Sequence, residues 1–206
     1  MKNKTALTFI LALFLNYGSI AFGQNGKVLE AFTKSYEYET SGDYTNALSI
    51  LESVYEADSY EINIRLGWLN YKAGNYQKSL DYYNKSINLM PYSIEPKLGY
   101  NLPASALKNW DDVISKYKSI LEIDPQNTFV HYQLGNIYYE RKDFSSAYSS
   151  FEKIVNLYPF DFDSVLMFAW TNYQMGKLRE AKVLFSKALL ISPSNQSANE
   201  GMGLVK

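Results

Sequence analysis

Prolines recur at a constant interval in this chain. Four of them are evenly spaced, at Pro91, Pro125, Pro159 and Pro193. A second column keeps the same interval, at Gly74, Lys108, Lys142 and Gly176. Repetition at a fixed period of this length indicates an array of small supersecondary units, because one such unit cannot bury its apolar faces alone and must stack on its neighbours. This interval constrains the fold more than any single motif does.

One unit of the array has two apolar stripes at helical spacing. The first stripe contains Leu134, Gly135 and Tyr138, and the second contains Ala147, Phe151 and Ile154. The polar residues 141–143 separate the stripes, and a proline closes the unit because it cannot continue a helix interior. Each unit is therefore predicted to be two helices of about a dozen residues joined by a tight turn.

Small residues and large residues also recur at the same interval. The small ones predict tight turns and close helix crossings, and the large ones predict packing between neighbouring helices. Glycine at the end of a first helix suits a positive φ, which predicts turns at Gly42, Gly74 and Gly176. Small residues are expected where the two helices cross, at Gly67, Gly135 and Ala169 and at Ala47, Ser79, Ala147 and Ala181. Large residues are expected to fill the space between neighbours, at Tyr83, Tyr117, Phe151 and Phe185.

These columns resemble the tetratricopeptide repeat family, whose unit is a helix-turn-helix of about 34 residues. The resemblance implies an all-α, right-handed superhelical solenoid of about five repeats. We expect a repeat domain over residues 24–206, with repeats at about 28–59, 60–93, 94–127, 128–161 and 162–195 and a partial cap at 196–206.

The third repeat departs from the pattern. Its first helix contains Pro96 and Pro103, and Leu98-Gly99 stands two residues earlier than the Leu-Gly of other repeats. We expect a kink and a two-residue shift of register there, either as a tolerated irregularity or as a hinge. In the cap, Gly203 keeps the small-residue register.

Residues 1–23 have the layout of a cleavable signal peptide. Lys2 and Lys4 precede an apolar run over residues 6–15, and small residues follow it. We expect cleavage after Gly23, with Ala21 as the alternative, and a periplasmic or secreted mature protein without stable membrane insertion. An uncleaved membrane anchor is the competing interpretation. The chain has no cysteine, so a lipid-modified N-terminus and disulfides are excluded.

The family resemblance also implies that the first helices line a concave surface. The stripe facing that surface is unusually aromatic, with Phe32, Ile64, Phe129 and Leu166 beside the polar Glu39 and Asp163. Exposed aromatic strips favour binding. The candidate groove residues are Tyr36, Trp68, Tyr71, Tyr132, Asn136, Tyr139, Trp170 and Tyr173, and Tyr100 joins them if the third repeat is shifted. Scaffold roles for Tyr71, Tyr139 and Tyr173 stay open. Some members of the family clamp a carboxylate with lysine on this stripe, but Phe129 and Tyr132 occupy those places here.

Composition argues against an enzyme and against a protein that binds nucleic acid. The single histidine, His131, and the absence of cysteine provide no zinc ligand set, and no glycine-rich phosphate loop occurs. The formal net charge of −1 does not suit a phosphate backbone. We therefore expect no enzyme activity, no cofactor and no metal.

The sequence predicts an interaction scaffold of the cell envelope that binds a protein or peptide in an aromatic-lined concave groove. Two alternatives remain. Aromatic rings with amide and carboxylate neighbours also suit a glycan. An apolar face left by a short cap would suit self-assembly into a homo-oligomer.

Overall fold

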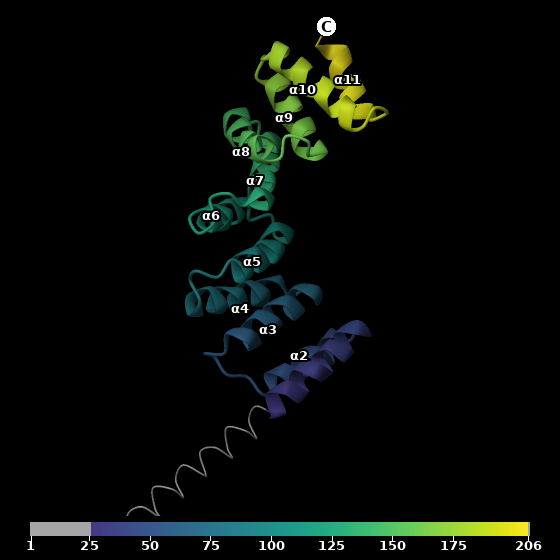
Figure 1. Ribbon diagram of the computed structural model, residues 1–206. Coiled ribbons are helices and arrows are strands. Elements are labelled where there is room, and N and C mark those ends of the chain that lie inside the picture. Colours follow the sequence, from purple (N-terminus) through teal and green to yellow (C-terminus); the bar gives the residue numbers. More distant parts are fainter. Residues whose placement is uncertain (1–25, 206) are drawn as a thin grey trace, which may run out of the picture. The chain divides into compact units, whose positions relative to one another are not determined.

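The computed structural model describes residues 26–205, and the predicted signal segment, residues 1–23, lies outside them. In the described part every regular element is a helix (Figure 1). After a helix at 26–40 come α2 (Tyr44–Glu52), α3 (Tyr60–Lys72), α4 (Tyr76–Leu89), α5 (Glu95–Ala106), α6 (Trp110–Leu121), α7 (Thr128–Glu140), α8 (Phe144–Leu157), α9 (Phe162–Gln174), α10 (Leu178–Ile191) and α11 (Gln196–Leu204). The described residues form two compact units, an N-terminal one that ends at Val113 and a C-terminal one that begins at Ile114.

Side-chain caps begin many of these helices. The residue before the helix accepts a hydrogen bond from a backbone N–H of the first turn at Asp43, Ser59, Asn127, Asp143, Asp161 and Asn195. Such caps satisfy donors that have no partner within the helix. The sequence therefore encodes the start of each of these helices locally, and stacking then fixes their arrangement.

The turn between the two helices of a repeat passes through the left-handed region. Glycine provides this conformation at three of the turns, with φ of +78° at Gly42, +79° at Gly74 and +73° at Gly176, which confirms the prediction. Lys108 and Lys142 hold the same place in the remaining turns, at φ of +60° and +59°. A side chain in this region crowds its own backbone, so these two lysines are strained where glycine would not be.

In the N-terminal unit, the 26–40 helix, α2 and α3 share one core. It contains Ala31, Ala47, Leu51, Ile62, Leu66 and Leu69, all nearly inaccessible to solvent. The next pair, α3 and α4, crosses at Gly67, where the buried Ser79 hydroxyl donates to the Gly67 carbonyl at 2.7 Å. This close approach confirms the expected crossing residues, because a larger side chain at either place would separate the two backbones.

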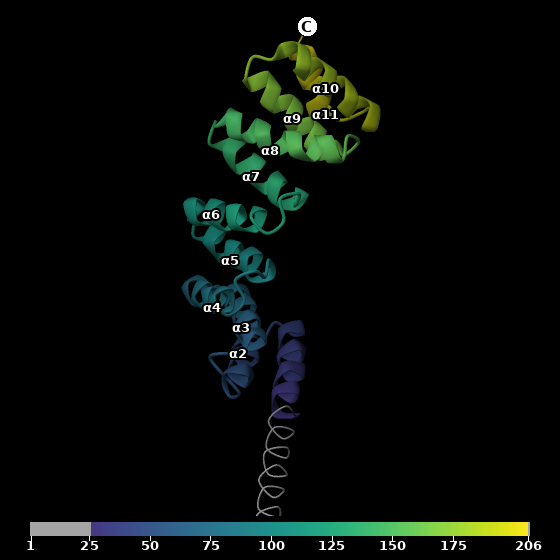
Figure 2. The ribbon, with the colours of Figure 1, turned by 60° about the vertical axis from the view of Figure 1, so that its left-hand side comes forward.

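In the C-terminal unit, α7 packs on α8, α8 on α9, α9 on α10 and α10 on α11 (Figures 1 and 2). The buried Phe151 of α8 fills the space beside Gly135 of α7, where an added Cβ would lie 2.7 Å from the ring. Phe185 of α10 reaches the element that follows its repeat, at Gly201 of α11, where an added Cβ would lie 2.3 Å from the ring. The aromatic residues that keep the period of the repeat therefore fill the spaces between adjacent helices, as predicted.

The third repeat is not shifted, so the register predicted for it is wrong. Asn101, which stands one full repeat after Gly67, occupies the crossing position, and its Nδ2 donates to the Val113 carbonyl of α6 at 3.4 Å. Gly99 instead faces the preceding repeat, where an added Cβ would lie 2.2 Å from the ring of Tyr83. The glycine resembled the crossing glycine in sequence, but it serves the contact between repeats rather than the contact within one.

The two prolines of α5 lie within one continuous helix. Pro96 falls in the first turn of α5, where a missing N–H removes no helical hydrogen bond. Pro103 lies inside the helix and is buried. A hinge at this repeat stays a prediction.

Candidate functional site

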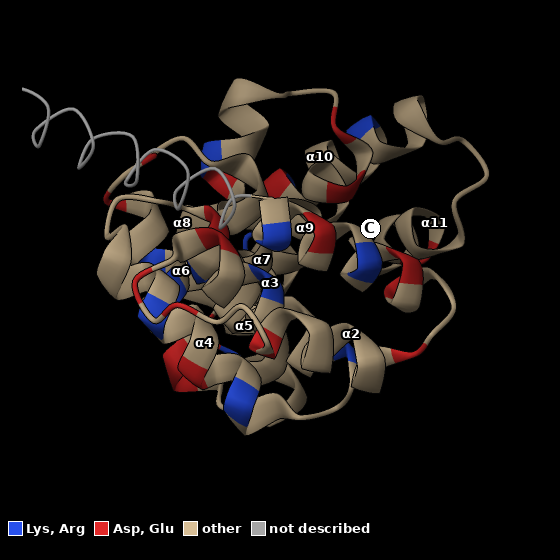
Figure 3. Cartoon of the chain, turned by 90° about the horizontal axis from the view of Figure 1, so that it is seen from below, with Lys and Arg blue, Asp and Glu red and all other residues tan. Residues whose placement is uncertain are grey.

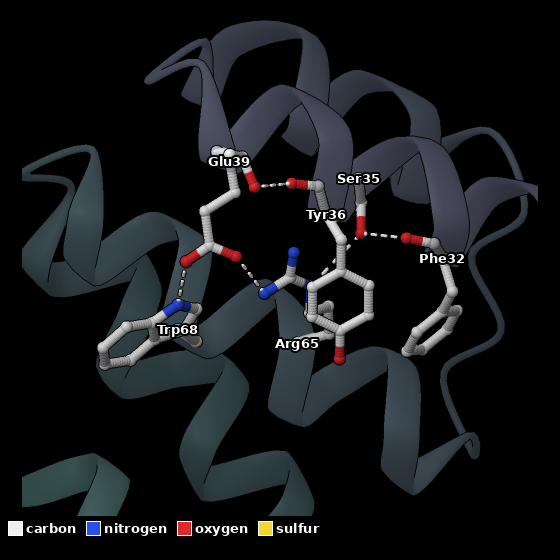
Figure 4. Close-up of polar contacts among 7 residues, drawn as sticks. Phe32, Ser35, Tyr36, Glu39, Arg65 and Trp68 are labelled. Atoms are coloured by element: carbon white, nitrogen blue, oxygen red, sulfur yellow. Dashed lines mark hydrogen bonds and ion pairs between the residues drawn. The ribbon is translucent and has the colours of Figure 1, made fainter.

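Two of the predicted groove residues of the N-terminal unit, Tyr36 and Trp68, contact a buried ion pair between neighbouring first helices. Glu39 of the 26–40 helix directs one carboxylate oxygen to Nη1 of Arg65 in α3, at 2.5 Å, and the other to the indole N–H of Trp68, at 2.5 Å (Figure 4). The side chains of Arg65 and Glu39 are only 7% and 20% exposed. The carboxylate thus joins the first two repeats at the edge of the predicted groove.

Arg65 is enclosed on several sides. Its Nε donates to the buried Ser35 hydroxyl at 3.2 Å, and its guanidinium carbon lies 3.8 Å from the centre of the Tyr36 ring (Figure 4). Its Nη2 is buried and has no hydrogen-bond partner. A buried guanidinium depends on its counterion, because an isolated charge away from water is strongly disfavoured. Glu39 is therefore central to the local fold.

The predicted residues of this unit differ in exposure. Tyr36 is 54% exposed, whereas Trp68 and Tyr71 are half-buried and pack against each other at a centroid distance of 5.9 Å. The ammonium of Lys72 lies 5.5 Å from the centre of the Trp68 ring. Trp68 therefore has a packing role that the sequence did not reveal, in addition to its place on the predicted surface.

The predicted residues of the C-terminal unit are all half-buried, on α7 and α9. Trp170 lies edge-on to Phe185 at 4.9 Å and donates its indole N–H to Ser197 at 2.9 Å, and the Tyr173 ring lies 5.7 Å from it. The Tyr139 hydroxyl accepts from Gln174 at 3.5 Å, which links α7 to α9. The structure thus places Tyr139, Trp170 and Tyr173 beside contacts between adjacent first helices.

Each unit has a pocket bordered by its aromatic stripe. The N-terminal one, of about 600 Å³, includes Phe32, Tyr36 and Ile62 with the carboxylates of Glu56 and Glu61. The C-terminal one, of about 390 Å³, includes Phe129, Tyr132 and Tyr158 with the carboxylates of Asp161 and Asp163. Both lie where two successive first helices begin or approach each other, and of the eight candidate groove residues Tyr36 and Tyr132 line them. Trp68, Tyr71, Asn136, Tyr139, Trp170 and Tyr173 do not line these two pockets.

Tyr100 and His131 are both buried. Tyr100 is only 7% exposed, so its conditional assignment to the groove is wrong, and burial raises the pKa of its hydroxyl. The reason is the unshifted register of α5, which turns Tyr100 into the protein. His131 is buried, and its Nε2 donates to the Pro125 carbonyl at 3.0 Å, so this side chain stabilises the preceding turn.

Sequence reasoning missed Arg65. Its position, one full repeat before Gly99, faces the preceding repeat, and the later repeats have uncharged residues there: Gly99, Gln133, Met167 and Gly201. The sequence could have indicated Arg65, because it is a charged residue at a position of the repeat where the later repeats have uncharged residues. Phe129 and Asp163 were placed on the stripe but not among the candidate binding residues, although both line the C-terminal pocket.

Over residues 26–205, no group of three or more histidine or carboxylate side chains could hold a metal ion. Among the helices of the same part, none is long and apolar enough to cross a membrane. Basic and acidic residues are interspersed along the described helices (Figure 3). The arrangement offers aromatic surface with carboxylates, which suits binding through apolar contact and charge.

Models of the tetratricopeptide repeat family match residues 60–93, 130–161 and 162–195. No curated protein matches the chain. A solved tetratricopeptide repeat protein from Parabacteroides merdae ATCC 43184 is 19% identical with a TM-score of 0.73, over 87% of this chain and 72% of that one. MamA from Desulfovibrio magneticus RS-1 is 17% identical with a TM-score of 0.68, over 82% and 97%. MamA of MSR-1 is 25% identical with a TM-score of 0.63, over 81% and 97%.

Proposed function

The chain belongs to the tetratricopeptide repeat proteins, and on this premise we propose that it is a protein–protein interaction scaffold that binds a protein or peptide segment along its aromatic stripe. Repeat arrays of this kind present a preformed surface, so little ordering is needed on binding. Aromatic side chains on a rigid support provide large contact area at low entropic cost, which is why they are enriched at the centres of interfaces.

The observation that carries the proposal is the exposure of large aromatic residues at the pockets. Tyr36 and Phe129 are each 54% exposed, and each borders the pocket of its own unit. Two independent units thus combine an exposed ring with a cavity large enough for side chains. Exposed apolar surface beside a pocket is typical of a binding site, since packing alone would have buried it.

A capture experiment tests this function. The purified protein is incubated with an extract of the cell envelope from its native host, beside the Phe129→Ala and Tyr36→Ala variants. Leu190→Ala is the matched control, because Leu190 is 76% exposed on α10 and lines neither pocket. We expect a protein that is retained by the wild type and the control and lost from Phe129→Ala. Equal retention by all variants would place binding elsewhere, and no captured protein would favour a glycan or a second copy of the chain.

We also propose an envelope location, on the strength of the signal-like pattern in residues 1–23. Fractionation of the native host is expected to recover the protein outside the cytoplasm, with an N-terminus at Gln24 by mass spectrometry. Recovery of the intact chain from the cytosol would refute the location without bearing on the binding surface.

A further inference from the structure

The C-terminal pocket has aromatic walls and an acidic edge. Phe129 and Tyr132 come from α7, Tyr158 follows the last residue of α8, and Asp161 and Asp163 stand at the start of α9. Among the described residues that line it, none is basic. Phe129 and Tyr158 are 54% and 58% exposed, so the walls are open to an incoming side chain.

The electrostatic balance of this pocket is negative. Asp161 already accepts the Ser164 N–H at 3.0 Å and so caps α9, whereas Asp163 in the first turn is exposed. The N-terminal ends of α7 and α9 contribute partial positive charge, and the C-terminal end of α8 borders the same pocket and contributes partial negative charge. Each helix-end charge is a fraction of an elementary charge and the ends partly cancel, so the two carboxylates decide the sign of the potential in the pocket.

The chain itself shows how such surfaces hold cations. The guanidinium of Arg65 lies 3.8 Å from the centre of the Tyr36 ring, and the ammonium of Lys177 lies 3.8 Å from the centre of the Tyr148 ring. A cation over an aromatic face is attracted by the negative face of the ring. The C-terminal pocket offers the same faces together with carboxylates, but its lining contains no cation of its own.

The N-terminal pocket provides a contrast. One face of its Tyr36 ring is already covered by Arg65, whose charge is paired with Glu39. Val28, Leu29 and Phe32 make the rest of that wall apolar. Glu56 and Glu61 also give that pocket an acidic edge, so it differs from the C-terminal pocket in its larger apolar wall and in having a cation already against its Tyr36 ring.

We infer that the C-terminal pocket receives a lysine or arginine side chain of the bound protein, with its aliphatic part against Phe129 and Tyr158 and its charge beside Asp161 and Asp163. This inference rests on the proposed function and adds the chemistry of the partner: a segment that carries a basic residue beside apolar ones. The charge of the pocket then orients the segment, because the reversed segment would place its basic residue elsewhere.

Labelled repeating peptides test the inference by fluorescence anisotropy with the purified protein. The probe is a short Lys-Leu-Gly repeat, and its counterparts replace each lysine by glutamine or by glutamate. We expect the lysine peptide to bind about tenfold more tightly than the glutamine peptide and the glutamate peptide to bind least. Asp163→Asn, an exposed change of nearly the same shape, should weaken the lysine peptide about fivefold and leave the glutamine peptide unchanged.

Glu140→Gln is the matched control, because Glu140 is exposed at the far end of α7 and the substitution changes the net charge equally. An equal loss in this variant would overturn the inference, since it would show a general effect of charge. Equal affinity for the lysine and glutamine peptides would also overturn it. If Phe129→Ala still abolished capture of an envelope protein, the proposed function would stand without this selectivity. Binding of cellohexaose that is lost in Phe129→Ala, with no peptide binding, would assign the pocket to a glycan and refute both.

Discussion

Removing the carboxylate of Glu39 should destabilise the N-terminal unit far more than removing a carboxylate on the surface of the same helix. Among the described residues, Glu39 is the one carboxylate in an ion pair with Arg65, and it holds Nη1 at 2.5 Å. In Glu39→Ala the guanidinium would keep only the Ser35 hydroxyl and the Tyr36 ring, and Nη2 already has no partner. The charge would then be buried without compensation.

The magnitude follows from this burial. Loss of one member of a buried ion pair typically costs about 3–5 kcal/mol, and the 20% exposure of the Glu39 side chain admits some water, which favours the lower end, about 3 kcal/mol. With a urea dependence of about 2 kcal/mol per molar, the unfolding midpoint should fall by about 1.5 M. The indole N–H of Trp68 loses its hydrogen bond to Glu39 in this variant, so the fluorescence of Trp68 should report the change locally.

Two further variants distinguish the effect of the unpaired Arg65 charge from other causes of destabilisation. Glu39→Ala combined with Arg65→Met removes both charges, and its stability should return to within about 1 kcal/mol of the wild type. Glu30→Ala breaks the exposed Glu30–Lys34 pair, which is nearly as short at 2.6 Å, and should leave the midpoint unchanged. The reasoning is refuted if Glu39→Ala behaves like Glu30→Ala, or if the double variant is as unstable as the single one.

Three other substitutions test the fold. Lys142→Gly should stabilise the protein by about 1 kcal/mol in urea denaturation, because it relieves a side chain at φ +59°; an unstable variant would contradict the assigned strain. Gly135→Leu should cost about 3 kcal/mol or more, since even a Cβ there would lie 2.7 Å from Phe151, and full retention of thermal stability would show the crossing to be misplaced. Asp143 caps α8, and its bonds with Ser146 hold the pKa of its carboxyl below the ordinary value. The destabilisation in Asp143→Ala, about 1 kcal/mol near neutral pH, should therefore disappear as the pH falls below about 4 and the wild-type carboxylate protonates; a difference that persists at lower pH would argue against the cap.

Much of the fold could be predicted because small residues recur where two helices approach closely and large residues recur where a space between helices must be filled. Gly135 was predicted to let the second helix of its repeat approach closely, and the ring of Phe151 on that helix lies against it. Gly99 shows the limit of this reasoning. A glycine that admits Tyr83 of the preceding repeat has the same sequence appearance as one that admits the second helix of its own repeat. Only the three-dimensional stack distinguishes the two.

The candidate surface was less predictable than the fold. The position of a stripe follows from helical spacing, but the partners of each side chain depend on the adjacent repeat. Trp68 and Trp170 were assigned to the groove from helical spacing, and that spacing did not reveal that their indole N–H groups donate to Glu39 and Ser197. The pair between Glu39 and Arg65 joins residues of different repeats, and no local pattern connects them.

Site-specific photocrosslinking in the native host tests the central claim most directly. A photoreactive phenylalanine analogue replaces Phe129, which borders the C-terminal pocket, and in a second strain it replaces Leu190 on α10. Both positions are exposed, so the two strains differ in the face that is sampled. The account predicts a discrete protein adduct from position 129 that is absent from position 190. An adduct from position 190 alone would contradict it, because the binding surface would then lie away from the aromatic stripe.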